Sequence, residues 1–301
     1  MMSPTATGSA LQSALASHRY RGRALVMAHR GTAGATVPEN TARACQAAVL
    51  SGADIVEIDV IESTDGVFFA FHDGEEPSRL GRDIDLRELH SSEIATLPFA
   101  GIITSGMPAV VETLHTVLTG LWGRFPDAFV NLDRSWPCWP GLLPFLDGYG
   151  NPERLILKSH VADRDWRILQ RHAVKYPYIG ICRTVTDVDD VLAARDLNLV
   201  GLELIASDQH SPFYDPDYLR GLRDRGVLLL ANAEIVGSEN LFAGHDDDES
   251  LFGSATGGWN RLLALGFDII QTDWPWLLRR AITAQRRGER DARDAPPCAC
   301  R

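Results

Sequence analysis

Short apolar runs alternate with amphipathic segments along most of this chain, and this alternation constrains the fold more than any other feature. The run RALVMAH at 23–29 precedes the helix-like segment TARACQAAVLSG at 41–52, and the run ADIVEIDVIE at 53–62 follows it. Strands that alternate with helical patterns indicate βα units and an α/β fold. Further strands are predicted at 66–73, 128–133, 154–158, 178–182, 199–205, 227–232 and 267–272. Further helices are predicted near 109–119, 162–173, 186–195, 215–225, 257–265 and 275–284.

Most of the predicted strands are apolar at consecutive positions rather than at alternate ones. Strands that are buried on both faces, inside a ring of helices, have this pattern. No G-x-G-x-x-G turn occurs, and polar residues gather where strands end, so a closed parallel barrel is favoured over an open sheet. We therefore expect a single (β/α)₈ TIM barrel. Nine strands are predicted, but such a barrel has only eight, so one strand must lie outside it. We expect this peripheral strand within 178–205.

The length of 301 residues fits one barrel of this kind, although length alone would also allow two domains. We expect residues 21–285 to form the barrel, 1–20 a flexible arm and 286–301 a disordered tail, because the two ends lack apolar periodicity. Two long segments, about 73–107 and 233–256, carry mixed charge and glycine. We expect them to cover one end of the barrel as elaborated loops.

The charge balance excludes partners that need an extended basic surface. With 29 basic and 40 acidic residues the net charge is -11, so the field of the whole molecule repels nucleic acid and anionic lipid. No apolar stretch is long enough to span a membrane, and the N-terminus lacks the pattern of a secretory signal, which predicts no stable membrane insertion. Five scattered cysteines do not indicate a disulfide framework, and we expect a cytoplasmic protein.

Polar side chains end the first four predicted strands. In a barrel of parallel strands the carboxyl ends meet at one mouth, so residues far apart in the sequence are expected to converge there. In this chain the polar residues are His29 and Arg30 at the first strand, Glu57 and Asp59 at the second, His72 and Asp73 at the third, and Asp133 at the fourth.

Glu57 and Asp59 are two positions apart, so both side chains point to the same face of their strand. Two such carboxylates repel each other unless a cation lies between them, and hard oxygen ligands favour Mg²⁺ or Ca²⁺. The alternative is a pair of ion-paired acids without a metal. His29 and His72 beside a cation would suit acid and base catalysis at phosphorus, with buried, hydrogen-bonded histidines as the alternative. Arg30 suits bidentate contact with a phosphate.

A succession of motifs carries a family resemblance. The strings AHRG (28–31), PENT (38–41), GADIVEIDV (52–60), TDG (64–66) and FHD (71–73) occur in this order. Together they resemble the glycerophosphodiester phosphodiesterase family, whose members are metal-dependent (β/α)₈ barrels. Near the C-terminus HDDDES (245–250), GGW (257–259) and GFDIIQTDWP (266–275) are similar to one branch of the family, including its phospholipase C-like relatives. The resemblance spans roughly 24–284, with a poorly matching middle.

The resemblance implies a role for each matching residue and one divalent cation, Mg²⁺ or Ca²⁺, as cofactor. His29 and His72 match the acid and base pair, Glu57, Asp59 and Asp133 the metal ligands, Arg30 the phosphate contact, and Glu39 and Asn40 residues that shape the metal site. At the third ligand position the family often has Glu rather than Asp. For Asn40, capping the helix that begins near Thr41 is the alternative.

Two departures from the family pattern bear on the substrate. The family commonly has a lysine two positions after the third acid, where this chain has Ser135. Lys158, at the end of the next strand, could replace it as a phosphate or substrate contact, and a surface lysine with a buried stem is the alternative. The usual Trp-Thr-x-Asn of the penultimate strand is replaced by LANAEI (230–235), so Asn232 or Glu234 would line that side.

Several other side chains are weaker candidates. Trp274, in the closing loop, is expected to contact substrate. Three other tryptophans are expected to have a packing role, and the alternative is that they form an apolar wall for a lipid or sugar group. They are Trp136, Trp139 and Trp276. The acidic run 246–249 is typical of solvated loop acids or of a helix N-terminus, and a second metal site is the alternative. Glu203 is a candidate for the barrel mouth, and His160 and His245 are left without a role.

The sequence therefore predicts a metal-dependent phosphodiesterase that cleaves a glycerophosphodiester or related diester to a phosphomonoester and an alcohol. The expected partner is a small-molecule or lipid-derived diester, and the oligomeric state is left open. One alternative is a phosphodiesterase or lyase on a non-glycerol substrate, giving a cyclic phosphate as in the related sphingomyelinase D enzymes. The other is a barrel that binds a phosphorylated ligand without cleaving it.

Overall fold

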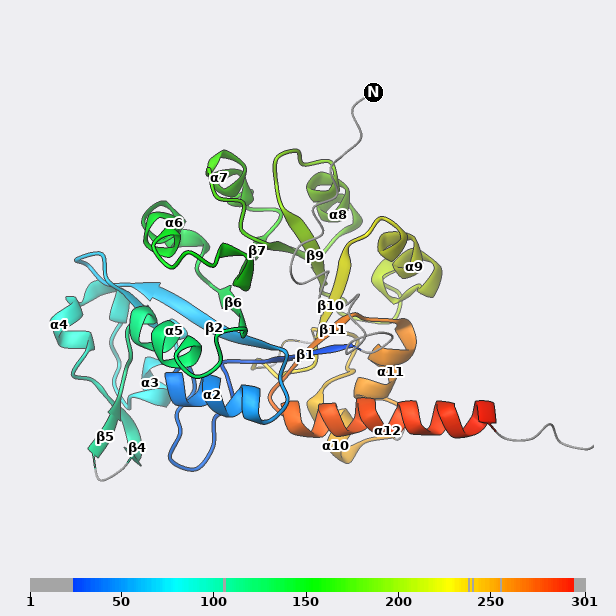
Figure 1. Ribbon diagram of the computed structural model, residues 1–301, viewed down its shortest axis with the longest axis horizontal. Helices are drawn as coiled ribbons and strands as arrows, with labels where there is room; N and C mark the ends of the chain where they lie inside the picture. The colour runs from blue at the N-terminus through cyan, green and yellow to red at the C-terminus, as the bar shows by residue number, and fades with distance from the viewer. Residues whose placement is uncertain (1–23, 105–106, 238, 240, 255, 295–301) are drawn as a thin grey trace, which may run out of the picture.

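Within the described residues, eight parallel strands close into a barrel (Figure 1). The structure is a computed structural model that describes residues 24–104, 107–237, 239, 241–254 and 256–294. The expected arm 1–20 and the last seven residues of the expected tail lie outside this part of the chain. In order around the barrel, the strands are β1 (Leu25–Ala28), β2 (Ile55–Glu62), β6 (Phe129–Asp133), β7 (Leu155–His160), β8 (Tyr178–Cys182), β9 (Leu199–Leu204), β10 (Leu228–Asn232) and β11 (Ile269–Thr272).

The first strand closes the barrel because it pairs with a neighbour on each side. Leu25 of β1 is in register with Ile269 of β11, and Met27 of β1 is in register with Ile55 of β2. Side chains of these residues fill the interior, whereas Val26 and Ala28, on the other face of β1, pack in the core beneath the helices. Both faces of each strand are therefore buried, which explains the unbroken apolar runs in the sequence.

Helices form the outer layer of the barrel (Figure 1). They are α2 (Ala42–Leu50), α5 (Leu114–Trp122), α6 (Trp139–Asp147), α7 (Trp166–Arg171), α8 (Val185–Leu192), α9 (Pro216–Asp224), α11 (Gly258–Leu265) and α12 (Pro275–Asp294). Short 3-10 helices lie at Leu86–Glu88, Trp136–Cys138, Pro152–Arg154 and Pro212–Tyr214. We did not predict α6 from the sequence. This helix contains Pro140 and Pro144 and buries Leu142 and Leu146 against the barrel. The last helix, α12, continues past Gln285 to Asp294, beyond the predicted boundary.

The peripheral strand is the third one, and our expectation that it lies within 178–205 is wrong. β3 (Phe68–Ala70) pairs antiparallel with the end of β2, while β8 and β9 both belong to the barrel. Only five residues separate β2 from β3. A parallel neighbour needs a crossover of a dozen or more residues, so this spacing permits only a hairpin. Gly66, with φ 81°, lies in its turn.

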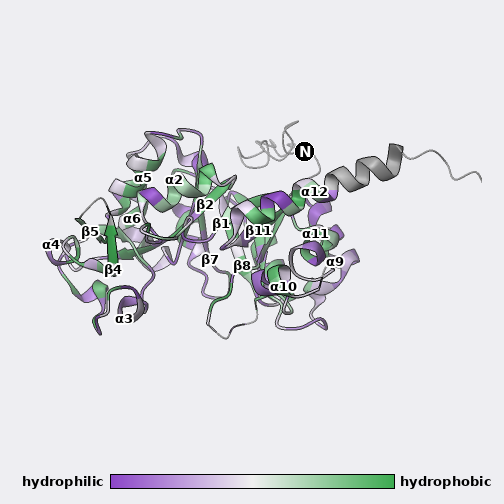
Figure 2. Ribbon diagram, turned by 90° about the horizontal axis from the view of Figure 1, so that it is seen from below, coloured by the Kyte–Doolittle hydropathy of each residue, from purple (hydrophilic) through white to green (hydrophobic). Residues whose placement is uncertain are grey.

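The segment that we expected as a loop over 73–107 folds against this hairpin. It contains α3 (Glu76–Arg79), α4 (Ser91–Ile94) and the strand pair β4 (Pro98–Thr104) and β5 (Met107–Val110). Because 107–110 form β5, the helix predicted at 109–119 begins only at Leu114. A small separate core joins the hairpin to this extension, and Figure 2 shows β4 as one of its hydrophobic elements. Its members include Ile61, Phe69, Leu86, Ile94 and Phe99.

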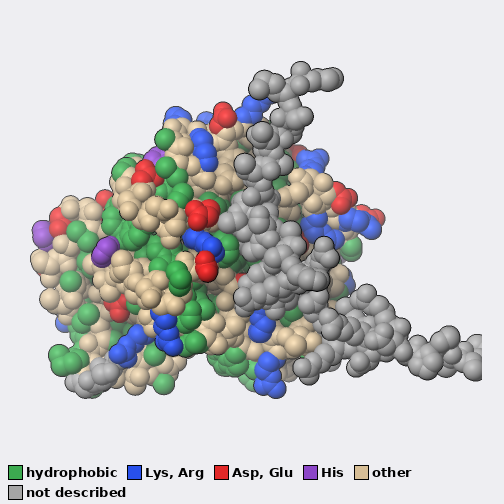
Figure 3. All heavy atoms as spheres, in the orientation of Figure 1, with side chains coloured by type: hydrophobic (Ala, Val, Ile, Leu, Met, Phe, Trp, Pro, Cys, Tyr) green, Lys and Arg blue, Asp and Glu red, His purple; other side chains and the backbone are tan. Residues whose placement is uncertain are grey.

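On the face shown in Figure 3, acidic and basic side chains are scattered among hydrophobic and uncharged ones. Among the helices of the described residues, none combines the length and the hydrophobicity that crossing a membrane requires. In the same part of the chain Cys45, Cys138 and Cys182 are buried free thiols.

Candidate active site

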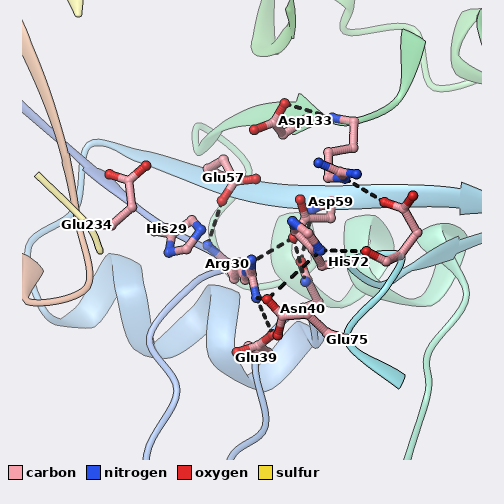
Figure 4. Close-up of polar contacts among 12 residues, drawn as sticks. His29, Arg30, Glu39, Asn40, Glu57, Asp59, His72, Glu75, Asp133 and Glu234 are labelled. Carbon is pink, nitrogen blue, oxygen red and sulfur yellow. Dashed lines mark hydrogen bonds and ion pairs between the residues drawn. The ribbon is translucent and has the colours of Figure 1, made fainter. Parts of the chain in front are cut away.

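Both predicted catalytic histidines face one small hollow at the barrel mouth. This polar cavity, about 120 Å³ in volume, is lined by His29, His72, Asp59 and Asp133 among other residues. His29 directly follows β1, and Asp59 and Asp133 are register partners on β2 and β6. Figure 4 shows the two imidazoles on either side of Arg30, with the carboxylates close by. The convergence of strand ends that the barrel predicted is therefore confirmed.

Three carboxylates lie together beside the histidines. Glu57, Asp59 and Asp133, here called the acid triad, each offer an oxygen within 4.8 Å of the others. Glu57 and Asp59 are almost completely buried, at 0% and 2% exposure, whereas Asp133 is partly exposed. Burying three carboxylates side by side is costly unless a positive charge compensates them.

The surroundings of Glu57 fit a bound cation. Its Oε2 accepts a hydrogen bond from the backbone N–H of Arg30 at 2.7 Å, while its buried Oε1 has no hydrogen-bond partner. Burial, followed by the charge of Asp59, raises the pKa of Glu57 well above its usual value. Oxygen-only ligands suit a hard divalent cation such as Mg²⁺ or Ca²⁺. The acid triad can therefore hold such an ion, as the sequence predicted.

Asn40 holds Asp59 in place rather than capping a helix. Its Nδ2 donates to Asp59 Oδ2 at 3.0 Å, and its Oδ1 accepts from the backbone N–H of Asp59 at 3.0 Å. The residue that caps α2 is Thr41, whose side chain accepts from Ala44 N–H. Asn40 adopts a φ of 56°, a left-handed conformation that asparagine tolerates better than most residues. The alternative of Asn40 as the N-cap is thus wrong.

Arg30 is surrounded by carboxylates. Its Nη1 donates to Glu39 at 2.8 Å and to Glu75 at 2.7 Å, and its Nε lies 3.2 Å from Asp59 Oδ2. Burial opposes its charge, but Asp59 and Glu39 outweigh it and raise the pKa of Arg30. The guanidinium therefore neutralises part of the negative charge around the acid triad, and Glu39 fixes its position.

His29 is oriented by Asp273, the residue that directly follows β11. The imidazole Nδ1 lies 2.8 Å from Asp273 Oδ1, so Nε2 is the nitrogen left for the cavity. Burial would lower the pKa of His29, but the hydrogen bond to Asp273 and the charges of Glu234 and Glu57 raise it to about 10. The contact with Asp273 therefore favours the protonated imidazolium form of His29, which has a proton to give.

His72 reaches the mouth on the returning strand of the hairpin. The backbone N–H of Phe71 donates to the carbonyl of Asp59 at 3.2 Å, which holds the end of β3 beside β2. His72 Nδ1 lies 2.9 Å from the carbonyl oxygen of Asp73. A carbonyl oxygen only accepts, so Nδ1 carries the hydrogen and a neutral His72 presents a lone pair on Nε2. The histidine reaches the predicted place by a different path from the one we predicted.

Lys158 is a buried ion-pairing residue. Its Nζ lies 2.9 Å from Asp133 Oδ2 and 3.0 Å from Glu203 Oε2, and the side chain is 1% exposed. Burial would raise the pKa of Asp133, but the Lys158 ammonium lowers it. Asn232 continues this network, because its Nδ2 donates to Glu203 Oε1 at 2.8 Å. The alternative of a surface lysine is wrong, and Glu203, a candidate for the mouth, lines the polar cavity.

We expect Lys158→Met to lower the free energy of unfolding by about 3–5 kcal/mol, because it leaves buried carboxylates without their counter-charge. Urea unfolding of the metal-free protein measures this effect. Lys175, the second lysine of the chain, is exposed, so Lys175→Met is the matched control and should change stability by less than about 0.5 kcal/mol. Equal stability of the two variants would contradict the role of Lys158.

A second, larger hollow adjoins the polar cavity. It has a volume of about 470 Å³, and His29, Arg30, Trp274, Trp276 and Ile235 contribute to its wall. We call it the aromatic hollow. Trp274 therefore lies at the site as predicted, whereas Trp276, for which packing was expected, also lines the hollow.

Most of the weaker candidates have structural roles. Trp139 is fully buried and donates to Ser135 Oγ at 3.0 Å, whereas Trp136 lines the polar cavity with its ring against His160. The acidic run 246–249 begins α10 (Asp247–Phe252), with Asp246 as its N-cap. Buried Asp247 accepts from the backbone N–H of Asp273 at 2.8 Å, and Glu249 pairs with His245 at 2.7 Å.

Sequence reasoning missed three residues of the site. Asp273 follows the last barrel strand, so the strand-end rule would have found it if applied beyond the fourth strand. Gln271, on the same strand, lines the polar cavity and donates to Glu234 at 2.9 Å. Glu75, which holds Arg30, belongs to the extension, and no signal in the sequence places it there.

Comparison with protein-family models identifies one family for most of the barrel. A model described as "Glycerophosphoryl diester phosphodiesterase family" matches residues 29–231. The matched stretch contains both histidines and the acid triad. It ends before Glu234 and Asp273, which come from the last part of the barrel.

Solved structures share the fold at low sequence identity. A glycerophosphoryl diester phosphodiesterase from Parabacteroides distasonis is 16% identical with a TM-score of 0.68, covering 87% of each chain. A phosphodiesterase from Oleispira antarctica, in complex with the product sn-glycerol-3-phosphate, is 19% identical with a TM-score of 0.62, covering 87% of this chain and 97% of that one. A glycerophosphodiester phosphodiesterase from Thermotoga maritima is 21% identical with a TM-score of 0.59, covering 86% and 98%. These likenesses support the barrel fold.

One curated protein matches over part of the chain. UDP-N-acetylmuramate–L-alanine ligase from Vesicomyosocius okutanii is 23% identical over 177 residues, which cover 56% of this chain. The match spans only 37% of the length of that protein.

Proposed function

Because this chain belongs to the glycerophosphoryl diester phosphodiesterase family, we propose that it is a divalent-metal-dependent phosphodiesterase. Its substrate is a small or lipid-derived glycerophosphodiester, cleaved to a phosphomonoester and an alcohol. One observation carries the proposal, namely that two histidines, one held at Nδ1 by the carboxylate of Asp273 and the other by the carbonyl of Asp73, face a single cavity beside the acid triad. A cytoplasmic location stays a prediction from the sequence.

The two histidines divide the proton transfers. His72 takes the proton of the attacking water on its Nε2, because its Nδ1 hydrogen is already committed to the carbonyl of Asp73. His29, held as an imidazolium by Asp273, gives its Nε2 proton to the oxygen of the leaving alcohol. A bond forms between the water oxygen and phosphorus, and the bond from phosphorus to the leaving oxygen breaks. Acid and base catalysis of this kind contributes about 10²- to 10⁴-fold in rate.

The acid triad would hold one cation, Mg²⁺ or Ca²⁺, on the oxygens of Glu57, Asp59 and Asp133. Such an ion, when bound, polarises a phosphoryl oxygen and neutralises developing charge. Asn40 and Glu39 act as positioning residues for Asp59 and Arg30 in this proposal.

The remaining site residues contact or frame the substrate. Arg30 is the proposed phosphate contact, because this residue lines both the polar cavity and the aromatic hollow. Lys158 faces the same polar cavity and balances the charge of Asp133. Asn232 lines the polar cavity, whereas Trp274 lines the aromatic hollow. Each is therefore proposed to contact a different alcohol group of the diester.

Turnover of glycerophosphocholine and of bis(p-nitrophenyl) phosphate, with Mg²⁺ or Ca²⁺ and after chelation, tests the proposal. We expect cation-dependent release of a phosphomonoester and its alcohol. Phosphorus NMR in ¹⁸O-labelled water distinguishes hydrolysis, which labels the phosphate, from attack by a substrate hydroxyl, which gives an unlabelled cyclic phosphate. Binding without turnover of any diester, with either cation, would overturn the assignment and favour a ligand-binding barrel.

A further inference from the structure

The two hollows at the barrel mouth share His29, Arg30 and Val236 in their walls. His29 and Arg30 line both the polar cavity of about 120 Å³ and the aromatic hollow of about 470 Å³. A phosphodiester carries two alcohol groups on one phosphorus. If the phosphoryl group lies at His29 and Arg30, as proposed above, the two hollows can receive one alcohol group each. Their different linings then decide which group enters which hollow.

The wall of the aromatic hollow exposes apolar side chains that a folded protein normally covers. Trp274 and Trp276 are 37% and 36% exposed, and Ile235, from the loop after β10, is 42% exposed. The two indole rings pack with their centroids 5.2 Å apart. Among the described residues eight large hydrophobic side chains are exposed, and three of them line this one hollow. A cluster of this kind is typical of a surface that binds an apolar ligand.

The polar cavity has some apolar side chains in its wall, such as Ile181 and Leu241, but its unpartnered oxygens disfavour an apolar group. Three buried oxygens, on Asn232, Glu234 and Gln271, have no hydrogen-bond partner and belong to residues that line it. A hydrocarbon group beside these oxygens could not donate a hydrogen bond to them, and leaving them buried without a donor would cost free energy. Its volume of about 120 Å³ corresponds to roughly four water molecules, which is enough for a small polyol.

A hydroxyl-bearing group fits the polar cavity better than a cationic one. Lys158, Arg134 and Arg183 line the cavity as well, each paired with a carboxylate, so the wall offers both hydrogen-bond donors and acceptors. A quaternary ammonium has no hydrogen to donate to the unpartnered oxygens. Hydroxyl groups both donate and accept, so they can satisfy acceptors and cations together. The small alcohol group of the substrate is therefore a polyol, which leaves the aromatic hollow for the other group.

We propose that the substrate is an amphiphilic diester whose larger alcohol carries an acyl or alkyl chain, and that Trp274, Trp276 and Ile235 bind this chain. These three residues determine specificity and take no part in proton transfer. The inference rests on the proposed phosphodiesterase function and adds the substrate class to it. The acidic residues Glu39 and Glu75 also line the aromatic hollow. The acyl or alkyl chain of the substrate is therefore expected to lie against the side of the wall that the two tryptophans form.

The test compares glycerophosphoglycerol with monoacyl glycerophosphoglycerols of short and medium chain length, all below the concentration at which they form micelles. We expect kcat/KM of the wild type to rise with chain length, because each methylene that leaves water favours binding of the transition state. Trp274→Ala, Trp276→Ala and Ile235→Ala should each lower the ratio of kcat/KM for the acylated over the deacylated substrate. The tryptophan variants should lower this ratio roughly tenfold to a hundredfold, and Trp274→Phe should restore part of it.

Phe252→Ala is the matched control, because Phe252 is 82% exposed and is not part of the wall of either hollow. It should leave the ratio unchanged. If the wild type cleaves both substrates without preferring the acylated one, or if the three variants keep the wild-type ratio, the inference is overturned while the phosphodiesterase function stands. If the wild type cleaves neither these substrates nor any other diester, the proposed function itself fails.

Discussion

His29→Ala is expected to lower kcat/KM for an alkyl phosphodiester by about 10²- to 10⁴-fold and to have a much smaller effect on bis(p-nitrophenyl) phosphate. An alkoxide is a poor leaving group and needs the proton of His29, whereas p-nitrophenolate leaves without one. His72→Ala is expected to lower kcat/KM for both substrates by about 10²- to 10⁴-fold, because the water must lose its proton whichever alcohol leaves. Steady-state kinetics with the two substrates therefore separates the acid from the base.

Exposed His210 provides the control for this pair of variants. His210→Ala should match the wild type on both substrates. Circular dichroism and the unfolding midpoint of each variant show that the loss arises in the site rather than in the fold. An equal loss for His29→Ala on the two substrates would contradict its role as the acid, and full activity of His72→Ala would contradict the proposed mechanism.

The division of roles depends on how the barrel closes. Ala28 and Thr272 are register partners on β1 and β11, so the next residues, His29 and Asp273, emerge side by side at the mouth. Closure thus brings a carboxylate from the last strand to a histidine from the first, 244 positions away in sequence. Glu234 follows β10 and adds its charge from the neighbouring strand. The proton on His29 is consequently a property of the closed barrel.

The sequence could predict the barrel and the acid triad because strand ends converge by geometry alone. Asp133 ends β6, and Glu57 and Asp59 lie within β2, which pairs directly with β6, so the three positions follow from the fold class. Rules of this kind do not need any knowledge of packing. His72 was also placed at the site, but for a partly wrong reason, because β3 returns as a hairpin instead of joining the barrel.

The surroundings of Arg30 could not be predicted from local sequence. Its guanidinium contacts Glu75, whose position depends on how the extension packs against the hairpin. Lys158 is a similar case, because only the pairing of β6 with β7 brings it to Asp133. A charged residue in an isolated strand gives no sign of its partner, and tertiary packing decides whether it binds substrate, another side chain or both.

Glu57→Gln is expected to lower cation-dependent activity strongly and yet leave the metal-free protein at least as stable as the wild type. Without a cation, the charge of Glu57 is unfavourable, because burial and Asp59 raise its pKa well above 4.5 in the folded state. The folded state then binds the proton more tightly than the unfolded state, so the metal-free wild type loses stability as pH rises above about 4.5. The neutral amide of the Glu57→Gln variant has no such charge, so its stability does not fall in this way. The difference in free energy of unfolding between the metal-free variant and the metal-free wild type should therefore widen from pH 5 to pH 8.

Adding Mg²⁺ or Ca²⁺ should reverse this order of stability. A cation that binds only the folded wild type stabilises it by about 2.7 kcal/mol at a concentration a hundred times its Kd. Glu57→Gln and Asp59→Asn should show little of that shift and lose activity on the order of 10³-fold, since the electrostatic contribution of a metal is worth several kcal/mol. Calorimetry in chelator and in excess cation measures the shift. Glu239→Gln, at an exposed acid on the rim of the same cavity, should keep the full shift. An undiminished shift in both triad variants would mean that the cation binds elsewhere.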